Sequence, residues 1–184
     1  DSILRENFLS KLVAPEQKPA NFWSQFSYLD LSFDCWQYVC ILLRVDNHAQ
    51  LREKLGQEGY DGRFALLKEQ VKGALGQWKT WCFETAEHNL AVIVGARQVR
   101  AEREALNTWS RKIQTDAQNR FGFFLSFGIG NPVDTPEQIK YSYAQAQDAL
   151  DARFFHRSGS VLFYEDLLQQ DSDVEYCFPI SIEE

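Results

Sequence analysis

The chain has 184 residues, of which 45% are hydrophobic, 14% aromatic and 24% charged, a composition typical of a globular domain and not of a disordered segment. Its 26 acidic and 19 basic residues give a formal net charge of −7, which disfavours binding to phosphate backbones by these residues. No apolar run reaches the roughly 18 residues of a membrane span, and no basic-then-apolar leader is present, so we expect no membrane contact. Met is absent, which indicates an excised fragment or a processed chain.

The N-terminal fifth of the chain predicts helices followed by a buried strand. Residues 2–13 have helical spacing, and Pro15 and Pro19 interrupt the pattern that follows. A second, short helix rich in aromatic residues is expected over about 21–29. Residues 36–46 are nearly continuously apolar, which predicts a central strand covered on both faces.

Two helices are predicted next. Asn47 is placed to cap a helix over about 48–55. Gly56 and Gly59 are expected to break it, and a further helix is expected over about 61–78.

A hairpin and a helix–strand pair occupy the middle of the sequence. Strands over 79–84 and 90–94 flank a polar turn at 87–89, which is a hairpin signature. A long helix is predicted over 97–119, with Leu106, Trp109 and Ile113 on one face, followed by a strand over 122–129.

The last predicted helix has a well-defined start. Thr135 is the expected cap, Pro136 takes the first helical position, and Gln138 can complete a capping box. The helix is expected to reach about residue 155. Its predicted inner stripe is Ile139, Tyr143, Ala146 and Leu150. After Gly159, residues 161–164 predict a closing strand.

This order of elements predicts an α+β fold: one mixed, mainly antiparallel five-stranded sheet with flanking helices, preceded by an N-terminal helical segment. The four cysteines form no CxxC pair and no disulfide framework, so we expect buried thiols and a reducing, cytoplasmic location. They are Cys35, Cys40, Cys82 and Cys177.

The order of elements resembles the nucleotide-cyclase-like fold of GGDEF domains, which make cyclic di-GMP. The segment Leu125–Gly130 and the helix that follows, with Ala144–Ala146 and Asp148–Leu150, are similar to the cyclase segment "SxGIA…AD.ALY". A finer resemblance is to the degenerate GGDEF-like middle domain of AraC-type regulators of the YesN kind. Its motifs stand here as Gly128–Gly130, Ser142–Tyr143, Ala146, Ala149–Leu150 and Phe163–Leu167.

Both ends of the chain also resemble that family. Residues 5–12 are similar to its first helix, and residues 178–183 to its lead into a DNA-binding module. The resemblance implies three parts: an N-terminal helical segment (1–33), a degenerate GGDEF-like domain (34–168), and a linker (169–184) toward a C-terminal DNA-binding domain absent from this sequence.

The residues aligned with the cyclase signature argue against catalysis. Alignment of Leu43–Asp46 with the cyclase "LDxD" puts Arg44 where a metal-binding Asp would stand, and a cation there repels Mg²⁺. Ala86–Asn89 stands where Gly-Gly-Asp-Glu would be, and Glu87 is one register off. We therefore predict no enzyme activity, no catalytic or metal-binding residue and no cofactor.

Other motifs have ordinary structural interpretations. His48, His88 and His156 are too scattered for a metal site. Gly128 and Gly130 lack the remaining residues of a phosphate loop, so a turn after a strand is the better interpretation. The basic residues of the helix over 97–119 are interleaved with acidic ones, which favours a solvated face.

The resemblance implies a non-catalytic linker, dimerisation or sensor domain of a bacterial AraC-type transcription regulator. A response regulator is favoured, although a membrane sensor upstream stays open. The full-length protein is expected to form a homodimer and to bind DNA through the C-terminal domain. The alternative is a sensor that binds a nucleotide or sugar in the former cyclase cleft, with binding residues that the sequence leaves unknown.

One interface is predicted. Leu4, Phe8 and Leu12 form a narrow apolar stripe on the first helix. The stripe has two open burial partners: the body of its own domain, or the same helix of a second copy.

Overall fold

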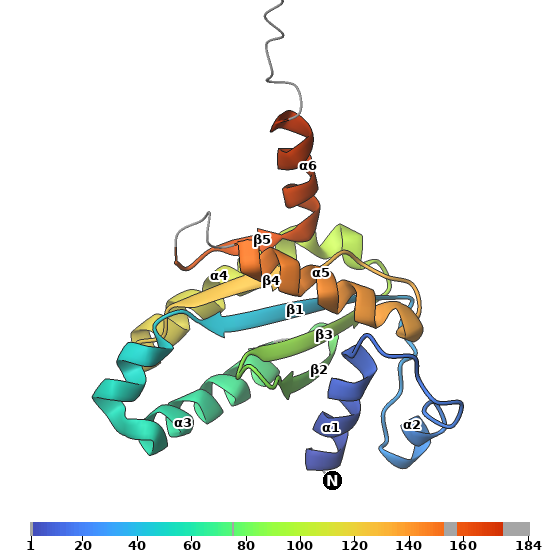
Figure 1. Ribbon diagram of the computed structural model, residues 1–184, viewed down its shortest axis with the longest axis horizontal. Helices are drawn as coiled ribbons and strands as arrows, with labels where there is room; N and C mark the ends of the chain where they lie inside the picture. Colours follow the sequence, from blue (N-terminus) through green and yellow to red (C-terminus); the bar gives the residue numbers. More distant parts are fainter. Residues whose placement is uncertain (1, 75, 153–157, 175–184) are drawn as a thin grey trace, which may run out of the picture.

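Five strands form one sheet in the order β2-β3-β1-β4-β5 (Figure 1). The computed structural model describes residues 2–74, 76–152 and 158–174. All neighbouring strands are antiparallel except β4 and β5, which are parallel. The predicted mixed, mainly antiparallel five-stranded sheet is therefore confirmed. The strands are β1 (Gln37–Val45), β2 (Lys79–Glu84), β3 (Leu90–Ala96), β4 (Leu125–Ile129) and β5 (Val161–Phe163).

The central strand β1 buries side chains on both faces of the sheet. Successive side chains of a strand point to opposite faces. Val39, Ile41 and Leu43 accordingly join a core with α3 and α4, whereas Tyr38 and Leu42 join a second core with α1 and α5. The helices are α1 (Ser2–Val13), α3 (His48–Ala74), α4 (Arg103–Phe121) and α5 (Ile139–Asp151).

The aromatic-rich segment before β1 is less helical than predicted. The expected helix over 21–29 is reduced to the single turn α2 (Gln25–Tyr28). Phe22 nevertheless packs in the core, where its ring stacks on Phe8 of α1 at 4.5 Å between centroids. This stacked ring pair joins the segment to α1, and such a contact does not require a long helix.

The glycine positions explain two differences from the predicted boundaries. Gly56 has φ +72° and kinks α3 as predicted, but Gly59 lies within the helix and breaks nothing. Gly122, the predicted start of a strand, instead ends α4 in the left-handed region with φ +74°, and its N–H bonds to Gln118. Glycine adopts this conformation without strain, so the helix ends there and β4 begins three residues later.

The two predicted helix caps are wrong in detail. The Asn47 side chain does not cap α3. Its Nδ2 donates to the carbonyl of Gly122 at 2.9 Å, and its Oδ1 accepts from the N–H of Phe124 at 3.0 Å. Thr135 precedes the 3₁₀ turn η2 (Pro136–Gln138) and its side chain makes no capping bond. The polar groups of Asn47 therefore bond to residues distant in sequence, whereas Gln138 Oε1 accepts a local hydrogen bond from the N–H of Asp134 at 3.2 Å.

Two elements were not predicted. The 3₁₀ turn η1 (Val99–Glu102) precedes α4, so the long helix begins at Arg103. The helix α6 (Tyr164–Val174) follows β5 directly and continues past residue 168, the predicted end of the domain, into the predicted linker (169–184). Figure 1 shows α6 projecting from the sheet on the side opposite the start of α1. The predicted end of α5 near residue 155, His156, Cys177 and the segment 178–183 lie outside the described residues.

The close packing of α5 on the sheet explains why glycine stands at positions 128 and 130, which we compared above with a phosphate loop. A Cβ at Gly128 would overlap the carbonyl oxygen of Ala146, and one at Gly130 would overlap that of Ser142. The Ser142 hydroxyl in turn accepts a hydrogen bond from the N–H of Cys40 at 2.9 Å. These motif residues therefore hold α5 against β1 and β4.

Candidate functional site

Residues aligned with the cyclase signature gather at one end of β1. A cavity of about 250 Å³ opens there between the end of β1, the β2–β3 turn and the start of α3. We refer to it as the cleft. It is lined by Arg44, Val45, His48, Arg52, Tyr60, Glu87, His88 and Asn89.

Arg44 stands at the edge of the cleft with its charge partly neutralised. On β1 it pairs with Ser126 of β4, and its Nη2 lies 3.2 Å from Asp151 Oδ1 at the end of α5. The Arg44 side chain is 19% exposed and that of Asp151 is 53% exposed. A guanidinium fixed at this place repels a divalent cation.

Asp46, the carboxylate left at the end of β1, has a structural task. Its Oδ2 accepts hydrogen bonds from the hydroxyls of Ser126 at 2.6 Å and Ser158 at 2.9 Å. The same oxygen accepts the N–H of Gly159 at 3.1 Å. Asp46 therefore fixes the connection that leads into β5. Its Oδ2 accepts three hydrogen bonds from the protein itself.

The turn between β2 and β3 is closed without glycine. His88 adopts φ +58°, and its Nδ1 lies 2.9 Å from Glu84 Oε1. The Thr85 N–H donates to the carbonyl of Asn89 at 2.8 Å, and the Asn89 N–H donates to the Thr85 hydroxyl at 3.2 Å. Glu87 is exposed at the tip. Among the described residues, no group of three or more His, Cys, Asp or Glu side chains could hold a metal ion.

Two cleft residues were missed in the sequence. The Arg52 guanidinium lies over the Tyr60 ring at 4.7 Å from its centroid. The kink at Gly56 lies between these residues, and both of them line the cleft. Burial raises the pKa of the Tyr60 hydroxyl, with Arg52 opposing the shift. The spacing of His48 and Arg52, four residues apart at a helix start, is the signal that could have found Arg52.

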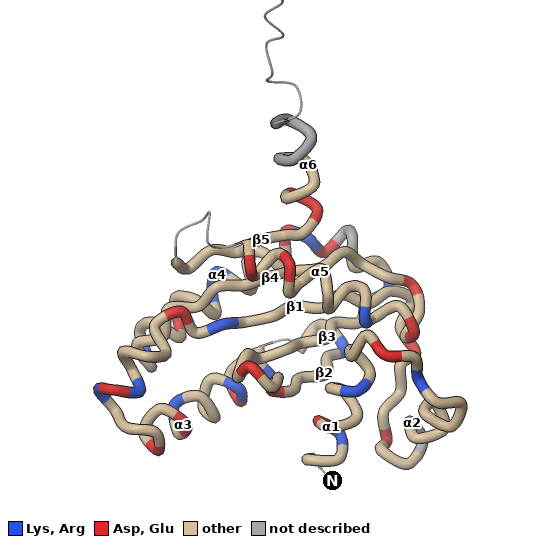
Figure 2. The backbone as a smooth tube through the Cα atoms, viewed as in Figure 1, with Lys and Arg blue, Asp and Glu red and all other residues tan. Residues whose placement is uncertain are grey.

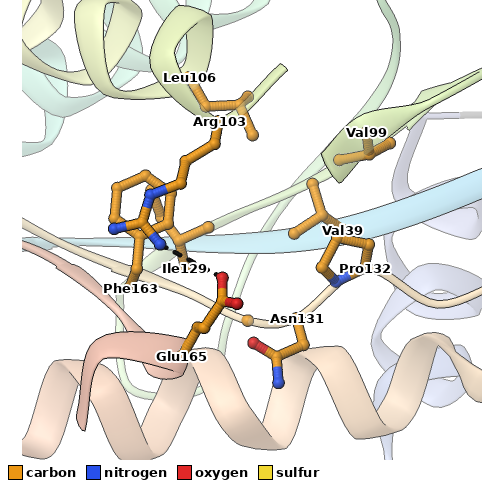
Figure 3. A pocket seen from close by; sticks show the side chains of 10 residues that line it. Val39, Val99, Arg103, Leu106, Ile129, Asn131, Pro132, Phe163 and Glu165 are labelled. Atoms are coloured by element: carbon orange, nitrogen blue, oxygen red, sulfur yellow. Dashed lines mark hydrogen bonds and ion pairs between the residues drawn. The ribbon is translucent and has the colours of Figure 1, made fainter. Parts of the chain in front are cut away.

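A second polar cluster lies at the opposite end of β1, where α6 leaves the sheet (Figure 3). Arg103 Nη2 contacts Asp166 at 2.6 Å, and Nη1 contacts Glu165 at 3.3 Å. The same guanidinium lies 4.2 Å from the centroid of the Phe163 ring. We refer to this group as the exit junction. Beside it is an apolar cavity of about 60 Å³ lined in part by Val39 and Ile129.

The predicted interface stripe is split by the fold. Phe8 is 3% exposed and Leu12 is 1% exposed, and both belong to the core that α1 shares with α5. Leu4 is 59% exposed, as is its neighbour Ile3 at 76%. Two of the three residues are thus covered within one chain, whereas pairing of α1 with a second copy stays a prediction that concerns Leu4.

The described cysteines are free thiols. Burial raises the pKa of Cys40, and raises that of Cys82 to about 12. A thiol reacts as thiolate, so both are inert at neutral pH. The charged residues along α3 are of both signs, and Figure 2 shows Lys and Arg interleaved with Asp and Glu. No described helix is long and apolar enough to cross a bilayer.

Residues 15–152 match the sequence profile of a family described as the GGDEF-like domain. A stretch of 65 residues is 37% identical to YtdP, an uncharacterised HTH-type transcriptional regulator of Bacillus subtilis. That stretch is 35% of this chain and 8% of YtdP, so the chain matches a small part of a much longer protein.

Solved structures share the fold at low sequence identity. The GGEEF domain of a diguanylate cyclase from Vibrio cholerae superposes with a TM-score of 0.56 at 13% identity, covering 77% of this chain and 88% of that one. An EAL/GGDEF domain protein from M. capsulatus gives 0.58 at 17% identity, covering 88% and 96%. These likenesses confirm the predicted nucleotide-cyclase-like architecture.

Proposed function

This chain belongs to the GGDEF-like domain family, and from that premise we propose that it is a non-catalytic regulatory domain of a bacterial transcription regulator. The arrangement at the end of β1 carries the proposal. Arg44 stands where the alignment with active cyclases has a metal-binding Asp. The nearby Asp46 Oδ2, which could otherwise bind a cation, accepts three hydrogen bonds instead. Phosphoryl transfer by a cyclase depends on metal-held phosphates, which this constellation does not provide for.

Incubation with GTP tests the loss of catalysis. With Mg²⁺ or Mn²⁺, we expect no cyclic dinucleotide by chromatography. Turnover that disappears in Asp46→Ala or Glu87→Ala would refute the proposal, because those are the carboxylates nearest the aligned signature.

The regulatory context is drawn from the relative and from the shape of the domain. YtdP is named as an HTH-type regulator, which supports a place beside a DNA-binding module. We assign this chain to the AraC type, in a cytoplasmic response regulator, with DNA bound by a C-terminal domain. The start of α1 and the end of α6 lie on opposite sides of the sheet (Figure 1), as suits a domain that transmits a change from one neighbour to another.

Self-association in the full-length protein completes the proposal. Leu4 and Ile3 expose apolar surface at the first turn of α1, where an upstream helix would continue. Leu4→Glu is expected to split a dimer into folded monomers, as measured by sedimentation. Phe8→Glu is the contrasting variant, since a charge at this buried position unfolds the domain whatever its oligomeric state. A dimer that persists in Leu4→Glu rejects α1 as the seam.

A second function is favoured by the cleft itself. The cavity of about 250 Å³ brings Arg44, His48 and Arg52 together with the β2–β3 turn. A regulatory domain with such a cavity can act as a small-molecule sensor. Thermal-shift measurements with candidate ligands test it, because a ligand at 100 times its dissociation constant adds about 2.7 kcal/mol to the free energy of unfolding.

A further inference from the structure

Two buried nitrogen donors at the cleft have no hydrogen-bond acceptor among the described residues. They are Arg52 Nε and Asn89 Nδ2. Asn89 is 3% exposed, so its side-chain amide is almost wholly removed from bulk solvent. Folded proteins satisfy the great majority of their buried polar groups, and each exception calls for an explanation. Two such donors from different elements, both on residues that line one cavity, point to a ligand that supplies acceptors.

The charge of Arg52 is also uncompensated. No carboxylate among the described residues lies within ion-pair distance of its guanidinium, and its aromatic contact with Tyr60 leaves the charge in place. The nearby carboxylates have other partners: Glu84 lies beside His88 at 2.9 Å and Asp151 beside Arg44 at 3.2 Å. Glu87, exposed at the tip of the turn, is the one carboxylate in the lining.

The start of α3 adds to the positive potential of the cleft. The first N–H groups of a helix have no partner within the helix, and they carry a partial positive charge. The Asn47 side chain, which could have capped them, is bonded instead to Gly122 and Phe124. His48, the first residue of α3, lines the cavity, so this turn faces the same space as Arg52.

The size of the cavity limits what it can hold. Pockets for drug-sized ligands have volumes of about 300–1,000 Å³. The cleft, at about 250 Å³, is smaller than that range and suits a ligand smaller than a nucleoside triphosphate.

We propose that the cleft binds a small oxyanion, a carboxylate or phosphate group, directly through Arg52 and Asn89 and without a metal ion. This inference rests on the sensor function proposed above and specifies its ligand class. The guanidinium presents a planar fork of donors that matches two oxygens of a carboxylate or phosphate. Arg44, whose Nη2 lies 3.2 Å from Asp151, adds a second, partly neutralised cation at the edge of the cleft.

Isothermal titration calorimetry with inorganic phosphate and, separately, malonate tests the proposal, each with and without Mg²⁺ and against NaCl of equal ionic strength. We expect saturable one-site binding of at least one anion, with an affinity that Mg²⁺ does not increase. Arg52→Gln is expected to weaken binding at least tenfold, which corresponds to about 1.4 kcal/mol. Arg97→Gln is the matched control, because Arg97 lies over Trp36, just after the end of β3 and outside the cleft lining. This variant should bind the anion as tightly as the parent protein does.

A second variant guards against loss of folding in the first. Asn89→Asp keeps the shape of the side chain but replaces the donor with a carboxylate, so it should abolish anion binding while circular dichroism shows a folded domain. The proposal is overturned if neither anion binds saturably, if binding requires Mg²⁺, or if both folded variants bind as tightly as Arg97→Gln. These outcomes leave the non-catalytic regulatory role untouched, because the GTP experiment tests the loss of catalysis and the Leu4→Glu experiment tests self-association.

Discussion

The two ends of β1 have opposite characters, although one strand connects them. At the exit junction the cation is satisfied, since Arg103 contacts both Glu165 and Asp166. In the cleft, Arg52 has no such partner among the described residues, and the amide of Asn89 lacks an acceptor. The exit-junction cavity is about 60 Å³ and the cleft is about 250 Å³.

Under the functions proposed above, the exit junction performs the mechanical task and the cleft takes the ligand. A cluster with its charges paired holds an element in one position, as α6 is held here. A cavity with unsatisfied donors keeps binding capacity at a cost in stability. The structure therefore has paired charges at the exit junction and two buried donors without acceptors beside the cleft, among the described residues.

The largest expected effect is on packing near the exit junction. Gly130→Ala should lower the free energy of unfolding by about 3 kcal/mol, because the new Cβ overlaps the backbone of Ser142, which cannot move aside. Gly62→Ala on the cleft side of the sheet is the control. No atom lies within 4 Å of its Cβ position, so a gain of up to about 1 kcal/mol is expected in urea unfolding. Equal losses in the two variants would contradict the contrast in packing.

Alkaline pH perturbs the buried strands between the two ends. Burial raises the pKa of Cys40 and Cys82 in the folded chain, so the folded state keeps protons that the unfolded state loses. The stability that this provides is complete below about pH 8.5 and is lost as the pH rises above it. Urea unfolding at pH 8 and pH 10 should differ by about 2 kcal/mol or more. Cys82→Ala should reduce that difference in the free energy of unfolding. An unchanged difference would show that Cys82 does not contribute.

Asp46 tests whether the cleft end retains a structural carboxylate or a metal ligand. Asp46→Ala should cost about 2 kcal/mol, because the donors of Ser126, Ser158 and Gly159 lose their acceptor. Glu87→Ala, at an exposed turn position, should change stability by less than about 0.5 kcal/mol. Thermal unfolding with and without Mg²⁺ provides the second readout. A midpoint raised by Mg²⁺ in the parent and not in Asp46→Ala would assign Asp46 to metal binding.

The smallest change in global stability is expected at the exit junction itself. Arg103→Gln should cost at most about 1 kcal/mol, since its ion pairs are partly exposed. Its local effect is larger: amide hydrogen exchange over 164–174 should accelerate, because α6 loses its contact with α4. Arg111→Gln on the same helix is the control and should leave exchange in α6 unchanged. Equal protection in both variants would mean that another contact fixes α6.

Local signals accounted for most of the fold. The apolar run of β1, the hairpin around the polar turn and the stripe of α5 were predictable because each pattern repeats with the period of its own element. Ile139, Ala146 and Leu150 are fully buried as that stripe requires. The helix α6 was missed because it follows β5 without a turn residue between them.

The sequence alone determined the chemistry available at the end of β1, because the cation at Arg44 and the absent glycines are matters of residue identity. Only the tertiary structure decided how that chemistry is used. Asp46 meets Ser158 across 112 positions, and Arg52 lines the same cavity as the β2–β3 turn. Likewise, helical spacing placed Phe8 and Leu4 on one stripe, but the extent of the neighbouring core covers Phe8 and leaves Leu4 exposed. Contacts between residues distant in sequence depend on how helices and strands pack together, and a local sequence pattern does not predict that packing.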